Sequence, residues 1–204
     1  MACTVAITGG IGSGKSAVCR CLTAMGLPVY DCDSRARAIM DADVEIHRRI
    51  ADEISPEVIS DGYIDRKRLA SVVFSDPEKL SRLNSIVHRA VRDDIRRWKS
   101  LHAHHPVLFI ETAILLESNL HRLVDCVWVV TARREVRLAR ACSRDNAQPE
   151  AIAARMDRQR IPARTDVDLP LYEIDNNGPT PLLPRIFVLL ADIVDPHTLR
   201  RWKN

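Results

Sequence analysis

Short apolar runs separated by longer amphipathic stretches recur along the chain. Because the runs are continuous rather than alternating with polar residues, they are typical of strands buried on both faces of a parallel sheet. The longer stretches have apolar residues at the three- and four-residue spacing of helices. This pattern predicts an α/β fold in which helices cover both faces of a parallel sheet. The five predicted strands comprise residues 5–7, 27–30, 107–110, 127–130 and 171–174.

The first apolar run is followed by a glycine-rich segment, residues 9–16, with the sequence G-G-I-G-S-G-K-S. This is the G-x-x-x-x-G-K-[ST] pattern of a phosphate loop, and it predicts a nucleoside triphosphate site. Glycines allow positive φ angles, so that backbone N–H groups can point at phosphate oxygens. Lys15 can reach the β- and γ-phosphates, and Ser16 offers a hydroxyl to Mg²⁺. The predicted nucleotide contacts are Gly10, Ile11, Gly12, Ser13, Gly14, Lys15, Ser16 and Ala17.

A glycine-rich turn could match so short a motif by chance. However, this match follows a predicted strand and precedes a predicted helix, which is the context that a phosphate loop requires. The helix has apolar residues at Val18, Cys21, Leu22 and Met25, and Gly26 is suited to its C-terminal end. The positive end of the helix dipole would add to the affinity for phosphate.

Three acidic residues follow predicted strands. Asp31 and Asp33 come after the second strand, where ligands bind in open α/β sheets, and either could instead cap the next helix. Glu111 ends the third strand, where a Walker B acid or an ordinary strand-end carboxylate would lie. The sequence leaves both choices open.

Residues 42–105 form a polar, helical insertion between the second and third strands. Such insertions often carry the pocket for a second substrate. A turn is predicted at Asp61 and Gly62. Three histidines at positions 102, 104 and 105 suggest a metal site, but with no cysteine or acid nearby, solvated loop histidines are the favoured interpretation.

The segment 133–165 is rich in arginine and contains no lysine. Arg133, Arg137, Arg140 and Arg144 are spaced to lie on one face of a helix. A solvated charged face is the usual meaning of such a run. Because the planar guanidinium binds phosphate oxygens bidentately, the functional interpretation is a mobile lid that closes Arg140 or Arg144 over the transferred phosphoryl group.

Composition narrows the possible partners. The net charge of +3, from 30 basic and 27 acidic residues, is too balanced to indicate general binding to nucleic acid or to a membrane. The first residues carry no charged leader, and no apolar run is long enough to span a bilayer. We therefore expect a soluble, cytoplasmic protein, with one α/β domain and insertions in its 204 residues.

Taken together, these segments resemble the dephospho-coenzyme A kinase family along nearly the whole chain. The matching segments are the phosphate loop at 8–16, D-x-D-x-x-A-R at 31–37, residues 61–66, Leu83 and Asn84 with His88, the lid with Arg140, Arg144, Arg155 and Gln159, and residues 174–178. Two departures stand out. Arg89 replaces a proline that is usual in the family, and residues 113–117 are A-I-L-L-E where the family has P-L-L-x-E.

The resemblance implies a kinase with three parts that transfers phosphate from ATP to the ribose 3′-hydroxyl of dephospho-CoA, giving ADP and CoA. The nucleotide-binding core would comprise residues 1–41, 106–132 and 166–204. The helical insertion at 42–105 would bind the coenzyme, and the segment 133–165 would be the lid.

The resemblance also implies roles for single residues. The catalytic residues would be Lys15, Asp33 and Arg140. Arg144 and Asn176 would join the phosphate loop in binding ATP. The acceptor would be bound by Asp33, Arg37, Asn84 and His88. Mg²⁺ would be held by Ser16, and by Asp31 through a water molecule.

Two other kinds of protein also use a phosphate loop. Another P-loop kinase of small metabolites, such as a nucleoside monophosphate kinase, would share the loop, the sheet and the arginine lid, and only the insertion and Asp33 argue against it. A GTPase would need a guanine-binding N-K-x-D segment, which the chain lacks; residues 176–178 have neither the lysine nor the aspartate.

Overall fold

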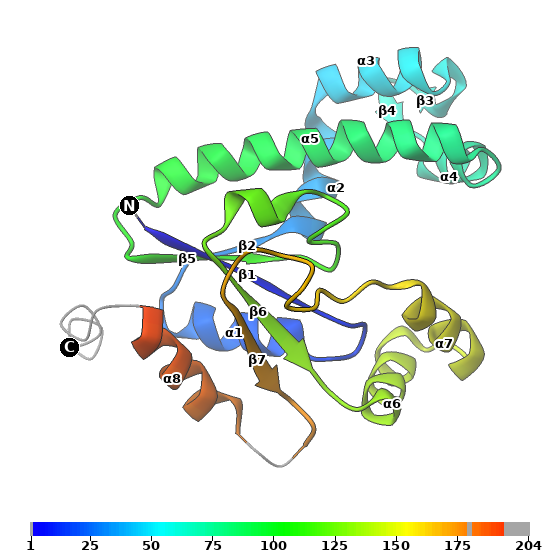
Figure 1. Ribbon diagram of the computed structural model, residues 1–204. Coiled ribbons are helices and arrows are strands. Elements are labelled where there is room, and N and C mark those ends of the chain that lie inside the picture. Colours follow the sequence, from blue (N-terminus) through cyan, green and yellow to red (C-terminus); the bar gives the residue numbers. More distant parts are fainter. Residues whose placement is uncertain (1, 179–180, 194–204) are drawn as a thin grey trace. The chain divides into compact units, whose positions relative to one another are not determined.

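The computed structural model describes residues 2–178 and 181–193 (Figure 1). Residues 1, 179–180 and 194–204, which the sequence assigned to the nucleotide-binding core, lie outside this part. The chain divides into two compact units, one made of Met1–Tyr30 with Leu101–Asn204 and the other of Asp31–Ser100.

The first unit is built on a five-stranded sheet with the order β2-β5-β1-β6-β7 (Figure 1). β1 pairs in parallel with β5 and β6, and β6 pairs in parallel with β7. The strands are β1 (Cys3–Gly9), β2 (Val29–Asp31), β5 (Val107–Glu111), β6 (Cys126–Thr131) and β7 (Leu171–Asp175). Each of the five apolar runs contributes to one strand, so the predicted α/β fold is confirmed.

Both faces of the sheet are buried, which explains why the strands are apolar without alternation. On one face Phe109 and Trp128 pack with ring centroids 5.2 Å apart. The helices α1 (Lys15–Ala24) and α8 (Leu182–Ile193) pack against the same cluster, and Figure 1 shows both on one side of the sheet. On the opposite face, Ala6 and Leu108 are no more than 1% exposed.

The arginine-rich segment folds into α6 (Arg134–Asp145) and α7 (Pro149–Arg158), after the short 3₁₀ helix η2 (Leu120–Leu123) and strand β6. The two helices share a small core of Ala141, Ile152 and Met156. Ile11 of the phosphate loop packs against this core, so the predicted lid segment belongs to the same compact unit as the sheet.

The second unit is mainly helical. Its elements are α2 (Cys32–Ala42), α3 (Val44–Glu53), the 3₁₀ helix η1 (Pro56–Val58), the hairpin strands β3 (Ile59–Ser60) and β4 (Tyr63–Ile64), α4 (Arg66–Phe74) and α5 (Pro77–Leu101). Asp61 and Gly62 form the predicted turn, with φ angles of 50° and 82°. Two consecutive positive φ angles match the right-handed twist of a two-residue hairpin. The hairpin itself is an addition to the helical insertion that we predicted.

The boundaries of this unit differ from the predicted insertion. The unit begins at Asp31 rather than at residue 42, and ends at Ser100 rather than at 105. The reason is that α2 packs with the later helices. Its Ile39 and Met40 join a core that contains Ile50 and Ile86, and its Arg35 forms an ion pair with Asp94 of α5 at 2.8 Å.

Aspartates begin all four α-helices of this unit. Each carboxylate accepts hydrogen bonds from backbone N–H groups of the first turn, which is the preferred way to satisfy these donors. The four capping residues are Asp31 for α2, Asp43 for α3, Asp65 for α4 and Asp76 for α5. The helix starts in this unit are therefore set by residues adjacent to them in the sequence.

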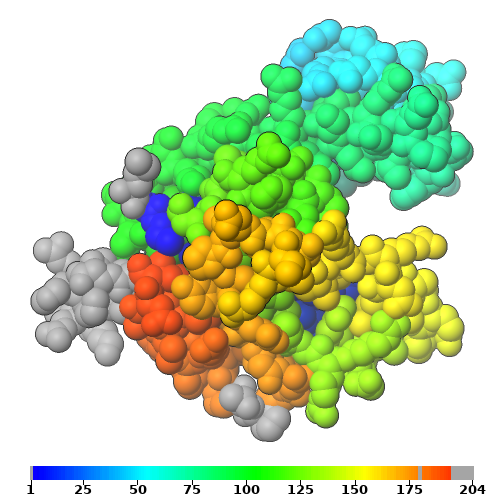
Figure 2. Space-filling model, viewed as in Figure 1, coloured from blue at the N-terminus to red at the C-terminus, as the bar shows by residue number. Residues whose placement is uncertain are grey.

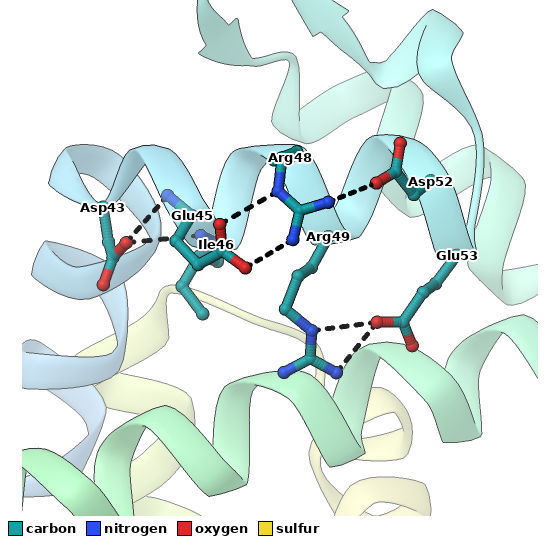
Figure 3. A network of polar contacts seen from close by, with 7 residues as sticks. All are labelled: Asp43, Glu45, Ile46, Arg48, Arg49, Asp52 and Glu53. Carbon is teal, nitrogen blue, oxygen red and sulfur yellow. Dashed lines mark hydrogen bonds and ion pairs between the residues drawn. The ribbon is translucent and has the colours of Figure 1, made fainter.

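A groove of about 480 Å³ lies between α3 and α5, and has an apolar floor that includes Ile46 and Ile86. Figure 3 shows that the arginines of α3 beside it are already paired: Arg48 with Glu45 and Asp52, and Arg49 with Glu53. These pairs are three or four residues apart, the spacing at which side chains meet on one helix. The charges along this rim are thus matched within α3.

Candidate active site

The phosphate loop lies between β1 and α1, and two of its glycines are required by what surrounds them. Gly12 and Gly14 have φ angles of 75° and 99°, which favour glycine. A Cβ atom on Gly12 would overlap the backbone carbonyl of Arg137, and one on Gly14 would overlap the side-chain amide of Asn176. The glycines of the motif therefore allow both the backbone turn and the close approach of distant segments.

Lys15 and Ser16 follow the loop at the start of α1. The Lys15 ammonium donates hydrogen bonds to the carbonyl oxygens of Gly9 at 2.8 Å and Gly10 at 3.3 Å, so that its charge lies along the loop. The Ser16 hydroxyl donates to a carboxylate oxygen of Glu111 at 2.9 Å. The sequence left the role of Glu111 open, and the structure brings it to the serine of the motif. Hydroxyl and carboxylate oxygens are ligands that suit Mg²⁺.

Two side chains from far along the chain bind the backbone of the loop. The Arg137 guanidinium on α6 donates to the carbonyl oxygen of Ile11 at 3.0 Å, and its burial lowers the Arg137 pKa. The Gln159 side chain, just after α7, accepts from the Ile11 N–H at 2.6 Å and donates to the carbonyl oxygens of Gly9 and Ala113, both at 3.3 Å. Gln159 was expected only as part of a segment shared with the family, because no local pattern in the sequence indicates these partners.

Asn176 connects the loop with the arginine-rich helix. Its side-chain amide donates to the carbonyl oxygen of Ser13 at 2.7 Å, while its own backbone carbonyl accepts from the Arg140 guanidinium at 2.9 Å. Asn176 is only 9% exposed. The structure thus brings together the phosphate loop, Arg140 and Asn176, three parts of the predicted nucleotide site.

A cavity of about 380 Å³ opens beside these groups. Its lining residues are Gly12, Gly14, Lys15, Ser16, Ala17, Arg20, Arg140, Arg144 and Asn176. All were predicted site residues except Arg20. Of the predicted nucleotide contacts, Gly10, Ile11 and Ser13 are not part of this lining. In Figure 2, dark blue atoms of the N-terminal segment are visible between the yellow-green and yellow segments that contain α6 and α7.

The structure separates the arginines of the predicted lid. Arg144 lines the cavity, but its guanidinium binds Asp145 through two hydrogen bonds of 2.7 and 3.1 Å. This contact, with a second one from Arg155, lowers the pKa of Asp145. Arg134 and Arg160 form ion pairs with Asp157 and Asp166 and are mostly exposed.

The predicted acceptor residues belong to the second unit. Asp31 caps α2, where one carboxylate oxygen accepts from the N–H groups of Asp33 and Ser34, at 3.0 and 3.2 Å. Asp33 and Arg37 are exposed and lie one turn apart on α2. Within the part of the chain that the structure describes, the Asp33 carboxylate accepts no hydrogen bond. Asn84 and His88 also lie one turn apart, on α5.

The three histidines before β5 lie close together, with ring centroids of His104 and His105 4.2 Å apart. Burial and the two neighbouring rings lower the pKa of His105. Among residues 2–178 and 181–193, no group of three or more histidines, cysteines or acids is arranged to hold a metal ion. No helix within these ranges has both the length and the apolar character needed to cross a membrane.

Known proteins with similar sequences are kinases, as the phosphate loop and its cavity indicate. The family model for dephospho-CoA kinase matches residues 3–181. The chain belongs to the dephospho-CoA kinase family. It is 37% identical to the dephospho-CoA kinase of Bacteroides fragilis strain YCH46, over 94% of this chain and 93% of the relative. It is 39% identical to that of Chlorobaculum tepidum, over 85% of this chain and 86% of the relative.

Solved structures show the same likeness. A crystal structure from Thermus thermophilus has a TM-score of 0.79 and 31% identity, and covers 95% of this chain and 98% of its own. The dephospho-CoA kinase of Campylobacter jejuni has a TM-score of 0.66 and 25% identity, and the match covers 94% of this chain and 96% of that one. The match to the dephospho-CoA kinase family includes all the predicted site residues. It also decides against the alternative of a nucleoside monophosphate kinase.

The structure places both residues that depart from the dephospho-CoA kinase pattern, Arg89 and Ala113. Arg89 is an exposed residue within the long helix α5 and lines the groove beside α3. Ala113 follows β5, and its backbone carbonyl accepts the hydrogen bond from Gln159. A backbone carbonyl is available from any residue type, so the change from proline to alanine keeps this contact with Gln159, which in turn binds the phosphate loop.

Proposed function

We propose that the protein transfers the γ-phosphoryl group of ATP to the ribose 3′-hydroxyl of dephospho-CoA, releasing ADP and CoA. The observation that carries this proposal is the cavity beside the phosphate loop, in which Lys15, Arg140 and Asn176 meet in a chain of the dephospho-CoA kinase family. We place the reaction in the cytoplasm, with ATP and dephospho-CoA as the partners.

The donor side of the reaction is assigned to the first unit. Lys15 would neutralise charge on the β- and γ-phosphates, and Arg140 and Arg144 would contact the phosphates once the segment 133–165 closes as a lid. Ser16 and Glu111 would hold Mg²⁺, since the Ser16 hydroxyl in the first turn of α1 lies 2.9 Å from a carboxylate oxygen of Glu111 at the end of β5. When bound, Mg²⁺ would neutralise the charge that develops on the phosphate oxygens.

The acceptor side is assigned to the second unit. Asp33 would orient the 3′-hydroxyl and accept its proton, because its carboxylate is exposed and not used by the helix cap. Arg37, Asn84 and His88 would bind other parts of dephospho-CoA. The cap role of Asp31 supports giving the proton to Asp33. The second Asp31 oxygen accepts from the Ser34 hydroxyl at 2.6 Å, and Asp31 would hold a water of the Mg²⁺ shell through its remaining lone pairs.

This function is tested by coupled ADP release with a panel of acceptors. We expect turnover with dephospho-CoA and a product that carries one additional phosphate at the ribose 3′ position, identified by mass and by phosphorus NMR. Nucleoside monophosphates should give no turnover above the background ATPase rate. Turnover of a nucleoside monophosphate without turnover of dephospho-CoA would reverse the proposal.

A further inference from the structure

Arg20 is the one residue in the lining of the phosphate-loop cavity that was not among the predicted site residues. It is exposed on α1, one helical turn after Ser16. Within the described residues it makes no hydrogen bond or ion pair. An arginine carries five N–H donors and a permanent charge, so that all of its binding capacity faces the cavity or solvent.

The other three cations of the cavity are already in contact with the protein. Lys15 binds loop carbonyls, Arg140 binds the carbonyl of Asn176, and Arg144 binds the Asp145 carboxylate. None of the nine lining residues is acidic. The lining of the cavity therefore carries an excess of positive charge that favours an anionic ligand, and Arg20 is a donor that needs no rearrangement to bind one.

We propose that Arg20 binds the α-phosphate of the nucleotide. This inference rests on the proposed function only in that the donor is a nucleotide. Lys15 reaches the β- and γ-phosphates in a loop of this type. Arg20 lies four residues after Ser16, which corresponds to a rise of about 6 Å along α1. Long side chains on a helix lean toward its N-terminus, so the Arg20 side chain extends back toward the phosphate loop. The Arg20 guanidinium consequently covers the turn at Ser16 and Ala17, beyond the β-phosphate position.

The experiment measures nucleotide affinity in the full-length protein without any acceptor. ATP, ADP and AMP compete against a fluorescent ADP on the wild type, on Arg20→Gln and on Arg20→Lys. Because a charge-assisted hydrogen bond to an exposed phosphate is lost, we expect Arg20→Gln to weaken all three ligands by a similar factor of about tenfold. Arg20→Lys should keep part of the affinity, since it keeps the charge but not the planar fork.

Different losses would overturn the assignment. A loss for ATP alone would place Arg20 at the γ-phosphate, and a loss for ATP and ADP but not AMP would place it at the β-phosphate. Unchanged affinity for all three would remove Arg20 from the site. Arg158→Gln is the matched control, because Arg158 is an exposed helical arginine outside the cavity lining and should leave affinity unchanged.

Failure of the Arg20 assignment can be distinguished from failure of the proposed function. Nucleotide competition needs no dephospho-CoA, so a protein that failed to phosphorylate dephospho-CoA would still test Arg20. Because Arg20 is exposed and makes no contact with other described residues, the thermal unfolding temperature of Arg20→Gln should equal that of the wild type. A lower unfolding temperature with proportionally lower affinity would indicate a structural role and contradict the proposal.

Discussion

The phosphate loop and the helical unit Asp31–Ser100 are stabilised by different kinds of contact. The loop is bound by Arg137, Gln159 and Asn176, which all lie more than a hundred residues further along the chain. Each α-helix of the second unit begins at an aspartate next to it in the sequence. The loop therefore depends on tertiary structure for its shape, whereas the helices of the second unit have local start signals.

Because the two regions are stabilised differently, substitutions in them should have different effects on stability and on activity. A substitution at a contact of the loop should change nucleotide binding and leave most of the fold intact, because the sheet beneath it is buried independently. A substitution in the core of the second unit should change the stability of that unit and the binding of the acceptor, with little effect on ATP. Substitutions at five positions test this separation, and Lys15 should give the largest effect.

Lys15→Ala should reduce kcat by about a hundred- to a thousandfold, the usual cost of losing a preorganised charge contact. The fold should be unchanged, because Arg137, Gln159 and Asn176 still hold the loop. Steady-state kinetics and thermal unfolding measure the two effects. Near-normal turnover would exclude this loop from catalysis.

Asp33→Asn should reduce kcat by about a hundredfold, with little change in KM for ATP, because the amide keeps the shape but cannot accept the proton. Stability should fall by only about 0.5 kcal/mol, since the Asp33 carboxylate takes no part in the cap and only its charge in the first turn of α2 is lost. Asp31→Ala is the control and should cost about 1 kcal/mol of stability through loss of the cap. If Asp31→Asn, which keeps a cap, lowers kcat more than Asp33→Asn, the catalytic roles are reversed.

Ile50→Ala should destabilise the second unit by roughly 2–5 kcal/mol, because Ile50 is fully buried in its core. Hydrogen exchange followed by mass spectrometry should show faster exchange in residues 31–100 than in the sheet. KM for dephospho-CoA should rise while ATP binding is unchanged. Val44→Ala, at a residue 77% exposed, is the control. Equal loss of ATP binding would contradict the separation.

Arg140→Lys should reduce kcat by about tenfold and weaken ATP binding less, because a residue that acts after lid closure contributes mainly in the transition state. Lysine also lacks the planar guanidinium whose N–H donates to the Asn176 carbonyl. Arg160→Lys should be nearly silent, because Arg160 pairs with Asp166 at the surface. A larger effect at Arg160 would mean that the wrong arginines were assigned to the site.

Gln159→Leu should raise KM for ATP by a few-fold, about the effect of removing hydrogen bonds that are each worth roughly 1 kcal/mol. The Ile11 N–H would lose its partner and the Gly9 carbonyl would lose one of its donors while keeping Lys15, so the loop would be less ordered before the nucleotide binds. Gln159→Glu keeps the acceptor for Ile11 but places a negative charge against the carbonyl oxygens of Gly9 and Ala113 and near the phosphates, so it should weaken ATP at least as much as Gln159→Leu. Affinity equal to that of the wild type in both variants would show that Gln159 does not position the loop.

Local chemistry allowed several features to be predicted from the sequence. The phosphate loop, the five apolar strands, and the turn at Asp61 and Gly62 are all present. Gly26 has the positive φ expected after α1, at 77°. In each case a few adjacent residues limit the backbone to one conformation, or make burial of a whole run favourable, whatever the rest of the chain does.

Only the tertiary structure decided which distant residues meet. Glu111 reached Ser16 because β5 pairs beside β1, and the cap at Asp31 showed which of two similar acids is used by the backbone. The start of the second unit at Asp31 likewise follows from the packing of α2. Arginine spacing alone could not separate Arg137 and Arg140 from their neighbours, nor indicate Arg20, because a side chain's partners depend on elements that the sequence places far away.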